Sequence, residues 1–258
     1  MPLPYTGQNG ELNFEADVVE LLKKARWEHE VLKNKTIPEL IDNWKDILFE
    51  RNRTTLNNVP LSSDEMDRVM DVVRLQANTP VKANHFVNGR PIAIKRDSDS
   101  PDKQHAGHEV YLDLFSATEI AGGSSRYQIA EQTYFSTDPQ FNDRRGDITL
   151  LINGMPVIHI ELKASGVNVY EASNQIVKYA NEGVWSGFMG LVQVFWAMTP
   201  EDALFFANAG NPTAFNSAFF FRWGDRDNNV IKDWRELITG EYHILSIPEA
   251  HKLVGYYT

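Results

Sequence analysis

The sequence predicts an α/β fold in which a central mixed β-sheet is flanked by helices, with a helical region at the N-terminal end. Two observations lead to this prediction. In the first 80 residues, apolar side chains recur at the three- and four-residue spacing of helices that bury one face. After residue 105, short apolar and aromatic runs dominate, with one further helical run among them. This order of elements is typical of a sheet covered by helices.

Three helices are expected in the part from residue 1 to residue 80. They are expected at Phe14–Leu32, at Ile37–Phe49, and from Ser62 or Ser63 to Leu75. Thr36 is a suitable N-cap for the second helix, and Pro38 fits its first turn. Asp64 and Glu65 lie where the helix dipole favours negative charge. Pro80 marks the end of the third helix.

The catalytic α/β part is expected over residues 105–245. A polar loop, Arg96–Lys103, precedes it. Strands are expected at Glu109–Phe115, Tyr127–Phe135, Asp147–Ile152, Val157–Lys163, Leu191–Met198, Ala203–Ala207 and Ala218–Trp223. Helices are expected at Tyr170–Glu182 and Val230–Ile238. No linker composition divides the chain, so residues 1–258 are expected to form a single domain.

Composition narrows the functional classes. The chain has 258 residues and no cysteine, which excludes disulfides and cysteine-bound zinc. It has no apolar stretch of the roughly 20 residues that a membrane helix needs. The formal net charge of −10 argues against tight DNA binding by basic side chains alone. It does not argue against a metal-dependent nuclease, because a bound cation supplies positive charge where the phosphate lies.

The segment between residues 145 and 163 carries the pattern with the most chemical content. Asn153-Gly154 lies between two apolar runs, which is a strong signal for a β-hairpin. On the second strand, His159, Glu161 and Lys163 alternate with apolar residues and therefore share one face. A Glu-x-Lys pattern taken alone is usually just a solvated strand face.

The length of the hairpin loop decides whether two carboxylates meet. A two-residue loop would place Asp147 opposite Ile160, on the wrong face relative to Glu161. A three-residue loop, Asn153 to Met155, would place Asp147 opposite Glu161, with Cβ atoms about 5 Å apart. The second arrangement is predicted, because it brings the two acidic side chains together.

Two carboxylates this close repel one another unless a cation lies between them. Mg²⁺ prefers hard oxygen ligands and is commonly held by one or two carboxylates plus substrate phosphate. Lys163, which projects to the same side as Glu161, could orient or help deprotonate an attacking water and neutralise charge on the phosphate. Asp147, Glu161 and Lys163 therefore form a coherent set for phosphodiester hydrolysis.

A second motif follows on the next helix, where Gln175 and Tyr179 are four residues apart and share a face. Asp, then Glu-x-Lys, then Gln-x-x-x-Tyr in this order resembles the nuclease domain at the N-terminal end of the type I restriction enzyme R subunit. That domain belongs to the PD-(D/E)xK superfamily, shared with RecB-like nucleases. The resemblance covers most of the chain and is carried by Asn153–Pro156, Ile160–Lys163, Ala172–Ile176 and Leu204–Asn208.

This resemblance implies a restriction-endonuclease-like fold and Mg²⁺-dependent endonucleolytic cleavage of double-stranded DNA. It implies that Asp147 and Glu161 bind the metal and that Lys163 acts on the water or the phosphate. Gln175 and Tyr179 would complete the site by positioning DNA or the catalytic groups. Glu15 resembles a first-helix glutamate of the family that faces the metal.

The resemblance also implies partners. The intact R subunit would join modification (methyltransferase) and specificity subunits in the cytoplasm of a prokaryote. ATP would be used by helicase-like motor domains that follow the nuclease domain. This chain contains no Gly-x-x-x-x-Gly-Lys-Ser/Thr motif, so it has no P-loop of its own. We therefore expect it to be part of a longer protein.

Some features depart from the family pattern. His159 lies where an aliphatic residue is usual, and we expect it to be a tolerated polar neighbour of the site. Ala25-Arg26-Trp27 replaces a common glycine-aromatic ending, which loosens the match at Glu15. His105-x-x-His108 is expected to be a loop. Two alternatives stay open: a degenerate nuclease fold that only docks or binds DNA, and a RecB-like repair nuclease.

Overall fold

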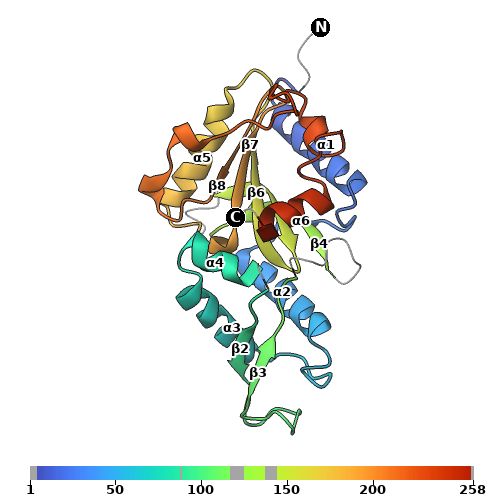
Figure 1. The fold of residues 1–258 in the computed structure, drawn as a ribbon, viewed down its shortest axis with the longest axis vertical. Helices are drawn as coiled ribbons and strands as arrows, with labels where there is room; N and C mark the ends of the chain where they lie inside the picture. The colour runs from blue at the N-terminus through green and yellow to red at the C-terminus, as the bar shows by residue number, and fades with distance from the viewer. Residues whose placement is uncertain (1–4, 88, 117–124, 137–143, 257–258) are drawn as a thin grey trace.

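The computed structural model describes residues 5–87, 89–116, 125–136 and 144–256. Its main sheet has six strands in the order β1-β4-β5-β6-β7-β8 (Figure 1). These strands are β1 Leu32–Lys33, β4 Tyr127–Tyr134, β5 Arg145–Ile152, β6 Met155–Leu162, β7 Val194–Met198 and β8 Ala203–Ala207. β1 pairs with β4, and β6 with β7, in parallel; the other neighbours are antiparallel. The sheet is therefore mixed, as predicted.

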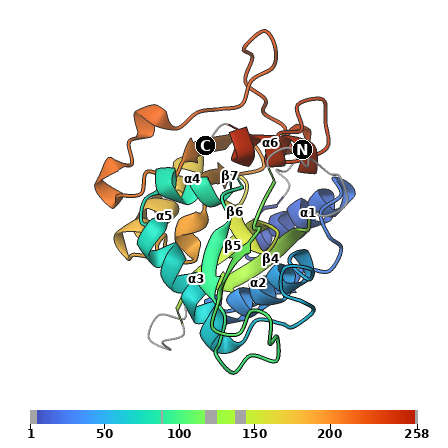
Figure 2. The ribbon, with the colours of Figure 1, turned by 60° about the horizontal axis from the view of Figure 1, so that its bottom comes forward.

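Helices cover the sheet. They are α1 Gly10–Lys24, α2 Ile37–Arg51, α3 Ser63–Gln76, α4 Pro80–Val87, α5 Val169–Asn181 and α6 Ile247–Tyr256. α5 and α1 lie on opposite sides of the strands in both views (Figures 1 and 2). Strands β6 and β7 are buried along their whole length, as central strands covered on both faces should be. The α/β class and the restriction-endonuclease-like architecture predicted from the sequence are confirmed.

The first helix differs from its prediction. α1 begins at Gly10 and ends at Lys24 instead of running to Leu32. The chain reverses at Arg26, whose φ of 76° lies in the left-handed region that ends helices. This turn buries Trp27, whose Nε1 donates a hydrogen bond to the Leu245 carbonyl, 2.9 Å away. Apolar spacing alone cannot reveal such a reversal, because the buried tryptophan continues the helical pattern.

The next two helices begin where the sequence predicts. Thr36 caps α2 by accepting from the Glu39 amide, while the Glu39 carboxylate accepts from the Thr36 amide. Ser62 and Glu65 form the same reciprocal capping box at α3. Each box satisfies backbone donors that the helix itself cannot satisfy, which fixes the helix start.

A smaller unit built from α3 and a two-stranded sheet lies beside the main sheet (Figure 1). Its strands are β2 Ile92–Lys95 and β3 Glu109–Leu112, which pair antiparallel on either side of the predicted polar loop. β3 was predicted, although as a longer strand. β2 and α4 were not, because β2 has only four residues and Pro80 was taken as a helix end. Pro80 instead begins α4, where its missing N–H is harmless.

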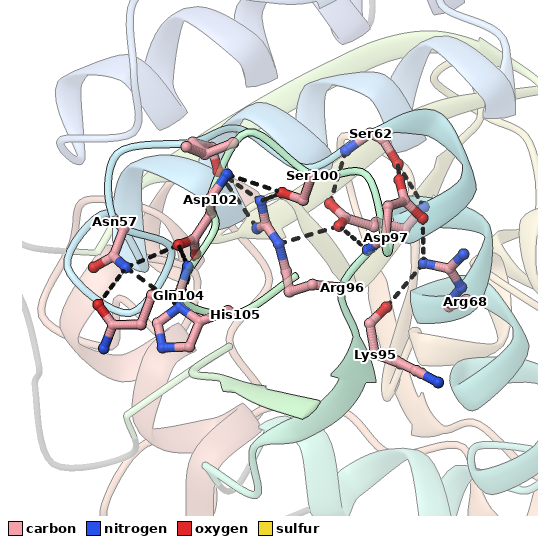
Figure 3. A network of polar contacts seen from close by, with 12 residues as sticks. Asn57, Ser62, Arg68, Lys95, Arg96, Asp97, Ser100, Asp102, Gln104 and His105 are labelled. Atoms are coloured by element: carbon pink, nitrogen blue, oxygen red, sulfur yellow. Dashed lines mark hydrogen bonds and ion pairs between the residues drawn. The ribbon is translucent and has the colours of Figure 1, made fainter. Parts of the chain in front are cut away.

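A buried polar network fastens this unit together (Figure 3). Arg96 Nε lies 3.1 Å from Glu65 Oε1, and both side chains are 1% exposed. Asp97 accepts from Ser62 Oγ at 2.6 Å and pairs with Arg68 at 2.8 Å. These contacts join the loop after β2 to the start of α3. They account for a charged pair in an otherwise apolar core.

The segment after β8 is mostly irregular. Ala218–Trp223, predicted as a strand, forms a short 3₁₀ helix, Ser217–Phe219, and one isolated bridge to Phe205. Val230–Ile238, predicted as a helix, contains only the 3₁₀ turn Trp234–Leu237. Both predictions are wrong. Phe220 and Phe221 contact the rings of Phe206 and Phe205 without forming a continuous strand. Asp233 accepts from the Arg235 amide, so the helical turn starts only at Trp234. No helix in the described ranges is both long and apolar enough to cross a membrane.

Candidate active site

The hairpin between β5 and β6 carries the predicted acidic pair, and its loop has two residues. Ile152 pairs with Met155, so Asn153 and Gly154 alone make the turn. Their φ values of 51° and 80° suit a type I′ turn. The predicted three-residue loop is therefore wrong. A side chain at Gly154 is further opposed by packing, since a Cβ there would lie 2.8 Å from Trp44 Cδ1.

A β-bulge restores the pairing that the shorter loop would have destroyed. The register shifts by one residue inside the ladder, which leaves Val157 as an extra residue on β6. Beyond the bulge, Ile148 pairs with Ile160. Asp147 and Glu161, the next residues along the two strands, therefore lie opposite each other. The predicted juxtaposition is reached by a different route.

Both carboxylates are buried. Asp147 is 8% exposed, and its Oδ2 accepts a hydrogen bond from the Leu162 amide, 2.7 Å away. Glu161 is 0% exposed, and its Oε2 lies 3.1 Å from His159 Nε2. Glu161 Oε1 has no hydrogen-bond partner in the part of the chain that the structure describes. A buried carboxylate oxygen without a donor is costly unless a ligand binds it.

Lys163 follows directly after β6 and brings positive charge to this pair. Its Nζ lies 3.8 Å from Glu161 Oε1 and 3.4 Å from Glu11 Oε1, and it donates to the Leu162 carbonyl at 2.9 Å. Burial lowers the pKa of Lys163. The negative charges of Glu161, Asp147 and Glu11 outweigh burial, and the net pKa is raised. The ammonium group therefore stays charged.

One lysine does not offset the acidic charge gathered here. Burial, and then the charge of Glu161, raises the pKa of Asp147 well above its usual value. Burial raises the pKa of Glu161 to about 8; Lys163 opposes this rise, and Glu11 and Glu15 add to it. A cation bound between the carboxylates would lower both pKa values, since opposite charge favours the ionised form.

Glu15 on α1 belongs to the same cluster. It is 3% exposed, and its Oε2 accepts a hydrogen bond from Gln132 Nε2. Its Oε1, like that of Glu161, has no hydrogen-bond partner among the described residues. Burial, and then the charge of Asp147, raises the pKa of Glu15 to about 8. The structure therefore brings Glu15 into electrostatic contact with the predicted metal-binding pair.

Gln132 is a site residue that the sequence analysis missed. The pairing of β4 with β5 places it opposite Asp147, and its side chain reaches Glu15. Its φ of 58° is unusual for a residue other than glycine, and such strain often accompanies functional sites. A lone glutamine in a strand has no pattern that marks it, so only the pairing identifies it.

Gln175 and Tyr179 on α5 approach the site from the other side. Gln175 Nε2 donates to the Tyr179 hydroxyl at 2.8 Å, and that hydroxyl donates to the Arg145 carbonyl at 3.1 Å. Tyr179 is 2% exposed, and burial followed by the charge of Glu161 raises its pKa. Ile176 is fully buried in the core. The two polar residues thus fasten α5 to the start of the strand that carries Asp147.

His159 and His105, two histidines noted in the sequence, have different surroundings. His159 is fully buried and hydrogen-bonded through both ring nitrogens, more tightly held than a merely tolerated polar residue needs to be. His105 lies in the predicted loop, where its Nδ1 is 2.7 Å from Asp102 Oδ2 and close to Asn57 (Figure 3). His105 therefore serves that loop and lies in a different part of the fold.

The donor set fits a hard divalent cation. In the described ranges, no three or more His, Asp and Glu side chains are gathered tightly enough to enclose a metal ion by themselves. Mg²⁺ does not require such a cage, because it keeps several waters and shares substrate phosphate oxygens. Asp147 and Glu161 offer facing carboxylates, and Oε1 of Glu161 has no hydrogen-bond partner among the described residues. These two residues are the ones that would hold the ion.

Comparisons with known proteins identify the family to which the chain is similar. A family model described as the type I restriction enzyme R protein N terminus matches residues 11–214. The chain is 28% identical, over 88% of its length, to the endonuclease subunit of type I restriction enzyme SsaAORF53P from Staphylococcus saprophyticus. It is 25% identical, over 86% of its length, to the SauMSSORF170P endonuclease subunit from Staphylococcus aureus.

A third relative, the EcoprrI endonuclease subunit of Escherichia coli, is 36% identical over 36% of the chain and 30% of that protein. The chain spans only 22% of the length of either Staphylococcus relative. The family match covers the hairpin, α5 and β8, and so includes each residue of the candidate site. The chain therefore belongs to the family of type I restriction enzyme R protein N-terminal regions.

Proposed function

We propose that this chain is a Mg²⁺-dependent nuclease domain that cleaves phosphodiester bonds of double-stranded DNA within a type I restriction enzyme. One observation carries the proposal: the bulged hairpin sets Asp147 opposite Glu161 in a buried acidic cluster, and Lys163, the lysine beside them, does not offset the charge of the carboxylates. An acidic, desolvated pair of this kind is costly without a cation and well suited to one.

Each residue has a distinct part in this proposal. Asp147 and Glu161 would hold Mg²⁺, which supplies positive charge at the scissile phosphate and lowers the pKa of water. Lys163, whose Nζ is already charged beside Glu161, would bind the phosphate and stabilise the charge that develops in the transition state. Glu15 would add a carboxylate on the α1 side.

Gln175 and Tyr179 would help to position Asp147. Their hydrogen bonds end on the carbonyl of Arg145, two residues before Asp147. A helix fixed to this point keeps Asp147 in register with Glu161, and positioning of this kind affects rate strongly. Gln175, which is only half-buried, is also placed to contact DNA.

The family match supports a proposal about partners. The matched relatives are named as endonuclease subunits of type I restriction enzymes and are much longer than this chain. We propose that the whole protein assembles with modification and specificity subunits in the bacterial cytoplasm. ATP would be used outside this chain, in a helicase-like motor, and the specificity subunit would select the DNA sequence.

The test uses the full-length subunit assembled with its partners. Asp147→Asn and Glu161→Gln should abolish cleavage, and Lys163→Ala should reduce it by about 10²–10³-fold, the effect of losing one donor that stabilises a developing charge. ATP hydrolysis should continue in all three. Glu249→Gln, a surface change on α6, is the matched control.

Cleavage at the normal rate by the Glu161→Gln enzyme would overturn the proposal. Parallel loss of cleavage and ATP hydrolysis in these variants, but not in Glu249→Gln, would assign the residues to assembly instead of catalysis.

A further inference from the structure

We propose that His159 is a positioning residue that holds the Glu161 carboxylate through its Nε2–H, with the Thr149 hydroxyl fixing the tautomer of the ring. The inference rests on the proposed function, because that function makes the Glu161 carboxylate a metal ligand.

Three side chains form a continuous hydrogen-bonded row across β5 and β6. Thr149 Oγ1 lies 3.1 Å from His159 Nδ1, and His159 Nε2 lies 3.1 Å from Glu161 Oε2. Thr149 and His159 are cross-strand partners, and Glu161 is two residues further on the same face of β6. All three are buried, with Thr149 1% and the other two 0% exposed. Water therefore does not compete for these bonds.

The direction of the two hydrogen bonds follows from which groups can donate. A metal-binding carboxylate is ionised and only accepts hydrogen bonds, so His159 Nε2 must carry the proton. His159 is fully buried, which favours the uncharged imidazole with a single N–H. Its Nδ1 is then an acceptor, and the only role left to the Thr149 hydroxyl is to donate. The tautomer is thus assigned by the hydrogen-bond pattern.

Packing keeps the imidazole in this orientation. Its ring centroid lies 4.9 Å from that of Trp185 and 5.8 Å from that of Phe135. Gly146 leaves the space for it, because a Cβ there would lie 2.6 Å from His159 Cε1 and 2.3 Å from Phe135 Cζ. The residue next to Asp147 is therefore small at the point where the imidazole needs room.

The two carboxylate oxygens of Glu161 therefore have different roles. Oε2 is occupied by His159, while Oε1, 3.8 Å from Lys163 Nζ, has no hydrogen-bond partner among the described residues. A carboxylate held at one oxygen loses little rotamer freedom when the other binds a metal. Partners that orient a metal ligand in this way typically affect metal affinity by about 10–100-fold.

The experiment measures Mg²⁺ binding to the 258-residue chain by isothermal titration calorimetry, after a thermal melt shows that each variant folds. His159→Gln places an amide near the position of Nε2 and can still donate to Glu161. His159→Asn reaches only the position of Nδ1 and cannot. Asn should weaken Mg²⁺ binding about 10–100-fold, and Gln should restore most of the affinity. Thr149→Val should have an intermediate effect.

Equal Mg²⁺ affinity for His159→Asn and the unchanged chain would overturn the inference, provided that Glu161→Ala abolishes binding. Retained binding in Glu161→Ala would instead overturn the proposed metal site. A second, independent readout is the ¹⁵N NMR spectrum of the unchanged chain with Mg²⁺ bound, the state in which Glu161 is ionised. It should show His159 protonated at Nε2 only; a ring protonated at Nδ1 would also contradict the inference.

Discussion

The metal-free chain should lose stability as the pH rises, and Glu161→Gln should remove the share of that loss that comes from Glu161. Glu161 is fully buried, and burial raises its pKa from 4.5 to about 8. A carboxyl group whose folded-state pKa exceeds its unfolded-state pKa binds its proton more tightly when folded. Its stabilising contribution is therefore complete below pH 4.5 and disappears as the pH rises through about 8.

The size of the effect follows from these two pKa values. Each tenfold difference in proton affinity is worth about 1.4 kcal/mol. Between about pH 5.5 and about pH 8.5, Glu161 should cost the folded state on the order of 3 kcal/mol. That is a large part of the roughly 5–15 kcal/mol that stabilises a typical protein. Adding Mg²⁺ at the higher pH should recover it, because binding to the folded state adds stability.

The assay is urea denaturation in a chelating buffer at both pH values. Other groups, including His159, titrate in both proteins, so the quantity of interest is the difference between Glu161→Gln and the unchanged chain. Glu249→Gln, at the surface, is the control and should leave the pH dependence as it is. If the difference for Glu161→Gln is the same at both pH values, or Mg²⁺ stabilises both proteins equally, the buried acidic site has been misread.

Three further changes have defined outcomes in thermal and urea melts. Gly146→Ala should destabilise the chain by about 1–3 kcal/mol, because its Cβ would lie 2.3 Å from Phe135; an unchanged melt would contradict this packing. Arg96→Met should cost about 3–5 kcal/mol by leaving the buried Glu65 carboxylate without its charged partner. A cost below about 1 kcal/mol, the worth of a surface ion pair, would refute this. Tyr179→Phe should cost about 0.5–1.5 kcal/mol while slowing cleavage; unaltered cleavage would remove its positioning role.

The starts of α2 and α3 and the central strands were predictable because their signals are local. Thr36 and Ser62 cap helices through contacts three residues away, which a sequence shows directly. The alternation of His159, Glu161 and Lys163 likewise showed which residues share a face. These features depend on neighbouring residues and on backbone period alone.

The details of the hairpin were not predictable in the same way. Asn153-Gly154 indicated the turn, but only the fold shows that the loop has two residues and that Val157 forms a bulge. A bulge at this point leaves no clear mark in the sequence, since the residue is apolar like its neighbours. The facing of Asp147 and Glu161 was expected, although for the wrong reason.

Contacts between segments that are distant in the sequence were also not predictable. Gln132 reaches Glu15 across 117 residues of sequence, and nothing near either residue announces the pairing. Pro80 was predicted to end a helix, although proline also occurs often in the first turn of a helix, as it does in α4. Such ambiguities are resolved by packing, which a single sequence does not display.

A cation bound between Asp147 and Glu161 is central to the proposed function, and an anomalous difference map tests its presence directly. Crystals of the chain grown with Mn²⁺, which accepts the same oxygen ligands, should show a peak about 2.0–2.3 Å from an oxygen of each carboxylate. On the Glu161 side, that oxygen should be Oε1, since Oε2 is occupied by His159. Peaks found only elsewhere, or none near this pair at saturating Mn²⁺, would contradict the account.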